Sequence, residues 1–237
     1  MFKPIISADS HVCEPPDTFT ARIDKKYQDV APHVVNDPVR GDIFEIKGIK
    51  KAIPLSLISA AGKPPEELST KGARVEELHR GGWDPEARLT DQDKDGIAAE
   101  VIYPSVGMEI CNLSDHDYKK ACMDAYNLWI AEFCDHAPER LIGLGQTPIR
   151  SIDEGIEDLR KIKALGLKGA MLPGKPAIPD VDYDHEMFDA FWQAAIDLEL
   201  PLSFHILTSG EMKSLQFRGT SINSGYAIIR ANQDIMS

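Results

Sequence analysis

The chain has 237 residues, of which 43% are hydrophobic and 27% charged, a composition typical of a globular protein with one large core. Its formal net charge of -12 and its sequence pI of about 5.0 argue against binding to nucleic acid or to an anionic membrane through bulk electrostatics. No apolar run in the sequence is long enough to span a bilayer.

The cysteines do not form a pattern typical of metal binding. They are Cys13, Cys111, Cys122 and Cys134, and none belongs to a C-x-x-C pair, so we do not expect a zinc–cysteine site. Three of them lie in or near one predicted helix, where they are interpreted as small buried hydrophobic residues. We therefore expect reduced thiols and a cytoplasmic protein.

The first predicted strand, at residues 4–11, ends in a carboxylate and an imidazole. Alternate side chains of a strand point to the same side, so Asp9 and His11 share a face. Such a pair is half of a possible metal site. Polar residues that simply end a strand are the alternative interpretation.

Residues 12–97 separate this strand from the next, which is too long for a plain βα connection. The alternating segment 42–54 contains a Lys-Gly turn and predicts a small β-hairpin. Residues 59–78 are rich in Pro, Gly and charge and predict a mobile loop. We expect an insertion that forms a lid, with His79 as a candidate lid residue. A surface excursion without a role is the alternative.

The run DQDKDG at residues 91–96 looks like the start of a calcium-binding EF-hand loop. An EF-hand requires a bidentate Glu at the twelfth position of that loop, which here is Ile102. The segment instead predicts a helix that starts at Asp84–Pro85 and ends at Gly96.

The second half of the chain alternates strands with helices. Strands are predicted near residues 98–104, 140–146, 167–172 and 200–205, and helices within 114–141, 151–166 and 182–200. The expected N-caps are Ser114, Ser151 and Asp184. The buried stripes are predicted to contain Cys122, Tyr126, Trp129 and Phe133; Ile152, Ile156, Leu159 and Ile162; and Phe188, Phe191, Trp192 and Ala195.

This alternation predicts parallel strands joined by right-handed crossovers. No G-x-G-x-x-G or P-loop motif follows any strand, which disfavours a nucleotide-binding doubly wound sheet. The favoured fold is an α/β protein, a (β/α)8 TIM barrel.

In a (β/α)8 barrel the active site lies at the C-terminal ends of the strands. Asp9, His11 and His205 all lie at such ends, so we expect them to converge. Three protein ligands are typical of a catalytic metal site. Tyr103, Ser105, Gln146 and Thr147 follow strands and either line the pocket or satisfy the backbone. The other histidines are interpreted as solvated or capping residues, and they are His33, His79, His116, His136 and His185.

Four segments together resemble the amidohydrolase superfamily, and they are DSHVCEPPD, GGWDPEARLTDQDKDGIAAEVIYP, NLWIAEFCDHAPERLIGL and LPLSFHI. The best resemblance is to its amidohydrolase-related branch, which includes aminocarboxymuconate-semialdehyde decarboxylase and γ-resorcylate decarboxylase. The resemblance implies one divalent metal, zinc or manganese, bound by Asp9 and His11 after the first strand and by His205 after the fifth.

The sequence also departs from the family pattern. The family's catalytic histidine after the sixth strand and its aspartate ligand after the eighth have no match here. Residues 226–236 predict the helix that follows the fifth strand. We therefore expect about five βα units of a longer protein, with both missing residues beyond Ser237. Binuclear members carry a modified lysine at the end of the fourth strand, but Lys168 lies at its opposite end, which favours a single metal.

The expected organisation has three parts, which are residues 1–34 with the first strand, an insertion or lid at 35–83, and barrel units two to five at 84–237. The resemblance favours non-oxidative decarboxylation of an aromatic or unsaturated carboxylic acid. A metal-dependent hydrolase of an amide, ester or lactone is the alternative, and a catalytically silent barrel used for binding is a second. The expected partners are a small-molecule carboxylate and further copies of the chain, without nucleic acid or membrane.

Overall fold

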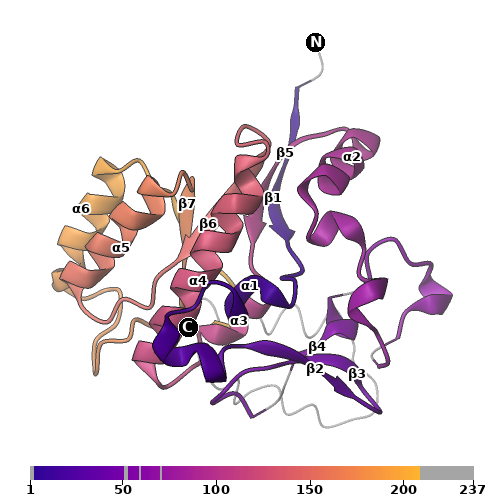
Figure 1. The fold of residues 1–237 in the computed structure, drawn as a ribbon. Coiled ribbons are helices and arrows are strands. Elements are labelled where there is room, and N and C mark those ends of the chain that lie inside the picture. The colour runs from indigo at the N-terminus through magenta and orange to yellow at the C-terminus, as the bar shows by residue number, and fades with distance from the viewer. Residues whose placement is uncertain (1–2, 51–52, 59, 70, 209–237) are drawn as a thin grey trace, which may run out of the picture.

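The computed structural model describes residues 3–50, 53–58, 60–69 and 71–208. Its central sheet has five parallel strands in the order β1-β5-β6-β7-β8, and a smaller sheet has three strands in the order β2-β3-β4 (Figure 1). The strands are β1 (Ile5–His11), β2 (His33–Asp37), β3 (Gly41–Glu45), β4 (Ile53–Pro54), β5 (Ile97–Tyr103), β6 (Leu141–Gln146), β7 (Gly169–Leu172) and β8 (Leu202–Phe204). The helices are α1 (Asp17–Thr20), α2 (Pro85–Asp95), α3 (Val106–Ile110), α4 (His116–Asp135), α5 (Ile152–Ala164) and α6 (Asp189–Asp197).

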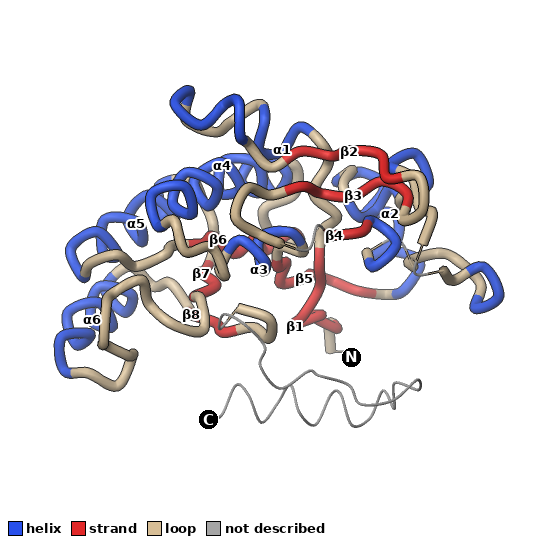
Figure 2. Tube along the Cα trace, turned by 90° about the horizontal axis from the view of Figure 1, so that it is seen from below, coloured by secondary structure: helices blue, strands red, loops and turns tan. Residues whose placement is uncertain are grey.

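In the central sheet, the strands lie side by side in the order in which they occur in the sequence, as they do in a (β/α)8 barrel. Each strand pairs in parallel with the next one of this sheet, so all C-terminal ends lie on the same side. Helices α4, α5 and α6 lie along one face of the curved sheet (Figure 2). The predicted fold class is therefore confirmed, as a curled sheet that forms part of a (β/α)8 barrel.

The hydrophobic core lies between the sheet and these helices. The predicted stripe of α4 is buried and contains Cys122, Tyr126, Trp129 and Phe133. In α5, Leu159 and Ile162 are buried, while Ile152 and Ile156 are partly buried against the same core. The helical hydrophobic pattern thus fixes which side of each helix faces the sheet.

Helix α2 has both of its predicted ends. The Asp84 side chain accepts a hydrogen bond from the backbone N–H of Ala87, Pro85 occupies the first turn, and Gly96 ends the helix with a φ of 69°. Residues 91–95 are helical, which excludes an EF-hand loop at this position.

Two predicted N-caps are wrong by one residue, and Ser151 is confirmed as the cap of α5. Helix α4 is capped by Asp115 instead of Ser114, because the Asp115 carboxylate accepts the N–H of Tyr118. Before α6, His185 instead of Asp184 caps a short turn at Glu186–Phe188. In both places neighbouring polar residues compete, and the backbone conformation decides which side chain reaches the free N–H groups.

The insertion after β1 contains the small antiparallel sheet. The hairpin predicted within 42–54 is present as β3 and β4. The third strand, β2, was not predicted, although it pairs with β3 from His33–Glu45 to Asp37–Gly41. It crosses the proposed domain boundary at residue 34, and the boundaries themselves remain a prediction.

Three further expectations concern the C-terminal residues, membrane-spanning helices and the cysteines. The helix predicted at residues 226–236 lies outside the described residues. No helix within the described ranges is long and apolar enough to cross a membrane. The cysteines are free thiols, and Cys111, Cys122 and Cys134 are buried as expected.

Candidate metal centre

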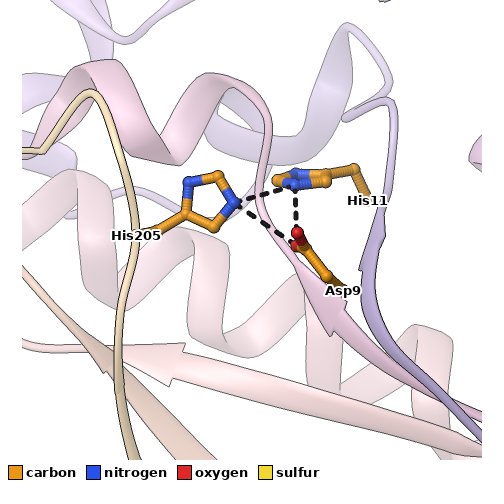
Figure 3. Close-up of side chains that lie close together, drawn as sticks. All are labelled: Asp9, His11 and His205. Carbon is orange, nitrogen blue, oxygen red and sulfur yellow. Dashed lines mark hydrogen bonds and ion pairs between the residues drawn. The ribbon is translucent and has the colours of Figure 1, made fainter. Parts of the chain in front are cut away.

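Asp9, His11 and His205 come together at the C-terminal ends of β1 and β8 (Figure 3). The Nε2 atoms of the two histidines are 3.2 Å apart. One carboxylate oxygen of Asp9 lies 3.4 Å from each of these nitrogens. Within the described ranges, this is the one group of at least three His, Cys, Asp or Glu side chains whose donor atoms are this close.

Backbone carbonyl groups orient both imidazole rings. Nδ1 of His11 is 2.9 Å from the carbonyl oxygen of Pro104, and Nδ1 of His205 is 3.1 Å from that of Ile206. Because a carbonyl oxygen only accepts hydrogen bonds, each Nδ1 is assigned the proton. In the neutral rings, both Nε2 atoms then carry lone pairs that face each other and Asp9.

The neutral form of His11 is favoured by its surroundings. Burial lowers the pKa of His11, and the neighbouring His205 lowers it further, while the Pro104 carbonyl and Asp9 oppose this shift. His205 is the more buried ring, with 13% of its side chain exposed, against 31% for His11. The Asp9 side chain is 69% exposed. The two Nε2 atoms and one carboxylate oxygen of Asp9 therefore converge, and the cluster is exposed to solvent on the side of Asp9.

Tyr103 lies beside both histidines. It is the partner of His11 in the register of β1 and β5, so the two side chains share a face of the sheet. Its ring centroid is 5.8 Å from that of His11 and 5.2 Å from that of His205. The hydroxyl forms a 2.6 Å hydrogen bond with Ser203 of β8. Tyr103 thus contacts the cluster, but it is buried and is not among the residues that border the cavity described below, so its role in the pocket remains a prediction.

The other three predicted pocket residues are placed differently. Ser105 borders the cavity described below, but its hydroxyl donates to the carbonyl of Val12. Gln146 and Thr147 are buried and are not among the residues that border this cavity. Gln146 donates to the carbonyl of Gly107, and Thr147 donates to Asp158. The contacts of Ser105 and Gln146 are those of the alternative interpretation, in which they satisfy the backbone, whereas Thr147 pairs with a side chain.

A cavity of about 770 Å³ opens next to the cluster. His11 and His205 border one side, and parts of the insertion border the other, including Ile58, Gly62 and His79. Residues of α2, β5 and α3 also line it. The insertion therefore forms a wall of the cavity, while its motion as a lid remains a prediction.

An ion pair that was not predicted links the two sides. Nε of Arg88 donates to Glu100 at 2.6 Å, and the pair is nearly buried, with 10% and 14% of the side chains exposed. One Nη atom of Arg88 lies 3.0 Å from the carbonyl oxygens of both His11 and Gly81. A charged Glu100 within an otherwise apolar strand was the available signal, but its partner lies on another element.

Glu14 is a second residue that was not predicted. It is fully buried, and its carboxylate accepts the backbone N–H groups of Ser105, Val106 and Gly107 at 3.0–3.1 Å. Burial raises the pKa of Glu14 to about 7, although these hydrogen bonds oppose the rise. Glu14 thereby fixes the loop after β1 against the loop after β5.

The fold was compared with known proteins. No family model matches the sequence. An amidohydrolase structure from Mycobacterium avium subsp. paratuberculosis K-10 is 21% identical and has a TM-score of 0.65, covering 99% of this chain and 62% of that protein. A 5-carboxyvanillate decarboxylase from Novosphingobium aromaticivorans DSM 12444, with bound manganese and a nitrobenzoic acid, is 20% identical with a TM-score of 0.53, covering 89% and 53%.

A dihydroxybenzoic acid decarboxylase from Polaromonas sp. JS666, with manganese and the inhibitor 2-nitroresorcinol, is 16% identical with a TM-score of 0.53, covering 99% of this chain and 55% of that protein. The chain thus spans 53% to 62% of the length of these three proteins. The chain has the fold of amidohydrolases and related decarboxylases, which confirms, at the level of the fold, the resemblance that its motifs indicated.

Proposed function

We propose that Asp9, His11 and His205 bind one divalent cation, and that the protein is a metal-dependent enzyme of the amidohydrolase superfamily. The observation that carries this proposal is the convergence of two Nε2 lone pairs and a carboxylate oxygen, with both Nδ1 atoms engaged by carbonyl groups. With both rings neutral and both Nδ1 atoms protonated, these electron pairs repel one another unless a cation or a proton lies between them. Hydrogen bonding of the second ring nitrogen is a common feature of metal-binding histidines.

The separations between the donor atoms fit a single shared ion. Two donors that are each about 2.1 Å from one ion lie about 3.0 Å apart at a right angle and about 3.4 Å apart at a tetrahedral angle. The observed separations of 3.2, 3.4 and 3.4 Å fall within this range. The donor set of two imidazoles and a carboxylate suits both zinc and manganese. Manganese is the first ion to test, because two decarboxylase structures with this fold contain it.

The proposed reaction is the non-oxidative decarboxylation of an aromatic or unsaturated carboxylic acid. A bound divalent cation would supply positive charge next to a substrate carboxylate. His11 and His205 border the cavity, so the ion that they hold would position the carboxylate end of the substrate there. Tyr103 packs beside both rings and supports them from behind. The bond between the carboxylate and the substrate carbon breaks, and CO2 leaves. The electron pair of that bond stays on the substrate carbon, which then takes up a proton.

Hydrolysis of an amide, ester or lactone is the second candidate, because one similar structure is described only as an amidohydrolase. The two reactions are distinguished by incubating the complete chain with Mn2+ and following the loss of CO2 from dihydroxybenzoates and carboxyvanillate, alongside hydrolysis of aryl esters and lactones. We expect manganese-dependent release of CO2 that is lost in His11→Ala. Turnover that is equal in the metal-free His11→Ala variant would contradict the metalloenzyme proposal.

A control variant makes this test specific. His136 is exposed and follows α4, at the end of the sheet opposite the cluster. We expect His136→Ala to keep the metal dependence of the unaltered chain. The association of several copies of the chain remains a prediction.

A further inference from the structure

The insertion brings another imidazole to the same cavity. His79 borders the cavity, and its Nε2 lies 2.5 Å from a carboxylate oxygen of Asp91 in α2. The second oxygen of Asp91 accepts from Lys94 at 3.2 Å. The His79 side chain is 40% exposed and that of Asp91 is 30% exposed, so the pair lies at the surface of the cavity.

The contacts of Asp91 define which nitrogen of His79 is available. The hydrogen bond from His79 lowers the pKa of Asp91, and Lys94 adds to this effect, so the carboxylate is ionised and only accepts. Nε2 of His79 therefore carries a proton. In the neutral ring, Nδ1 holds the lone pair, and it has no hydrogen-bond partner within the part of the chain that the structure describes.

Two glycines keep space around this pair. A Cβ atom at Gly62 would lie 2.9 Å from Nδ1 of His79, and a Cβ atom at Gly81 would collide with the Asp91 carboxylate. Gly81 has an ordinary negative-φ backbone, so the reason for a small residue there is steric. Both glycines border the cavity, which leaves His79 accessible from it.

Two other polar groups that border the cavity are already engaged. Arg88 borders the cavity, but its donors are directed to Glu100 and to two backbone carbonyls. The thiol of Cys13 donates to the carbonyl of Ile58, and burial raises the pKa of that thiol to about 12.

Two residues of α2 that border the cavity are acceptors too: Gln92 Oε1 has no partner among the described residues but is fully buried, and Asp95 carries an exposed carboxylate. Nδ1 of His79 is thus the neutral acceptor that the insertion offers to a ligand in this cavity.

We propose that His79, held by Asp91, binds a hydroxyl group of the substrate by accepting its hydrogen bond at Nδ1. This inference rests on the proposed function, in which the carboxylate end of the same substrate lies at Asp9, His11 and His205. The substrate is then an acid with a hydroxyl group remote from the carboxylate. A cavity of about 770 Å³ is in the range of sites for small organic ligands.

The first experiment does not depend on a metal or on turnover. The complete chain, with isotopically labelled histidine, is titrated with phenol and with anisole, and the ring nitrogen resonances of His79 are followed by NMR. We expect phenol to shift the Nδ1 resonance and anisole, which cannot donate, to leave it unchanged. Equal effects of both compounds, no effect of either, or a proton on Nδ1 in the free neutral ring would overturn the proposal.

The second experiment uses the manganese-loaded chain. Dissociation constants are measured for 3- and 4-hydroxybenzoate and for the matching methoxybenzoates. We expect one hydroxy compound to bind about tenfold more tightly than its methoxy counterpart, since a hydrogen bond of this kind contributes about that factor. The preference should disappear in His79→Leu and weaken in Asp91→Asn, while His136→Leu should retain it.

The variants separate this inference from the proposed function. We expect His79→Leu and Asp91→Asn to bind manganese as the unaltered chain does, because neither residue belongs to the metal cluster. An unchanged hydroxyl preference in His79→Leu would contradict the role of His79 while leaving the metal site intact. If the unaltered chain binds no manganese, the proposed function fails, and the phenol titration decides the role of His79 alone.

Discussion

One side of the cavity is formed by the ends of parallel strands, and the other by an insertion with little regular secondary structure. On the strand side, Asp9, His11 and His205 take their positions from β1 and β8, the two outer strands of the sheet, which β5, β6 and β7 connect. On the insertion side, the imidazole of His79 is held by one hydrogen bond within the described residues, to Asp91. The first arrangement follows from the fold, whereas the second depends on individual polar contacts.

This difference matches the roles proposed for the metal-binding cluster and for His79. A cluster that must hold three donor atoms within a few ångströms of one another gains from rigid strands. A group that recognises one part of a ligand can be carried by a loop and adjusted by a few contacts. Arg88 is the residue that joins the two sides.

Arg88→Met should have the largest effect on stability. The substitution removes the only cation paired with Glu100 among the described residues, which leaves this nearly buried carboxylate with Gln92 and Ser10 as donors. It also removes the donor to the carbonyls of His11 and Gly81. We expect the free energy of unfolding, measured with urea, to fall by about 3–5 kcal/mol. The double variant Arg88→Met/Glu100→Leu should recover much of this loss. A loss below about 1 kcal/mol in the single variant would show that Arg88 does not join the two sides.

Glu14, on the strand side, should make stability depend on pH. Burial raises its pKa from 4.5 to about 7 in the folded protein. The folded state therefore holds the Glu14 proton more tightly than the unfolded chain does. The stability that this proton contributes is fully present below about pH 4.5 and is lost as the pH rises towards 7. This contribution to the free energy of unfolding amounts to about 3 kcal/mol.

The Glu14→Gln variant isolates this contribution. It should be less stable at acidic pH, because an amide cannot accept three N–H groups as a carboxyl group does, but its stability should no longer fall between pH 5 and 7. Urea unfolding at a series of pH values measures both proteins. Parallel curves for the two proteins would be inconsistent with a raised pKa at Glu14.

Asp42→Ala tests whether single polar contacts hold the insertion. The Asp42 carboxylate accepts from Asn36 at 2.8 Å and from the backbone N–H of Val75 at 3.0 Å. We expect a loss of about 2 kcal/mol, since two partly buried donors lose their acceptor. Hydrogen exchange should accelerate at Val75 while the amides of β6 remain protected. Uniform acceleration would show that the insertion and the sheet unfold as one unit.

The smallest expected effect concerns the start of α4. Asp115→Ala should cost about 1 kcal/mol, because the N–H of Tyr118 loses its cap. Ser114→Ala, at the residue first expected to cap this helix, should change the stability by less than about 0.5 kcal/mol. Thermal unfolding of the two variants compares them directly, and the reverse order would favour Ser114 as the cap.

Regular periodicity explains which parts of the fold could be predicted. The central strands and the buried stripes of α4 and α5 follow from local patterns, as does α2 from Asp84 to Gly96. The convergence of Asp9, His11 and His205 required one further rule, that parallel strands in a barrel present their C-terminal ends on one side.

Contacts between distant segments explain what was missed. Arg88 and Glu100 pair across two elements, and Glu14 meets three N–H groups that lie some ninety residues further along the chain. Strand β2 has no strong alternating pattern of its own and forms because β3 offers it an edge. The contact of His79 with Asp91 depends on how the insertion packs against α2, which no local pattern encodes.

Metal binding to the complete chain tests the central claim most directly. Equilibrium dialysis against Mn2+, followed by elemental analysis, should give one manganese per chain. His11→Ala and His205→Ala should each bind it at least about 100-fold more weakly while keeping the circular dichroism of the folded protein. His136→Ala should bind manganese unchanged. An unaltered chain that binds neither manganese nor zinc, or a His11→Ala variant that binds manganese as tightly as the unaltered chain, would contradict the metal centre.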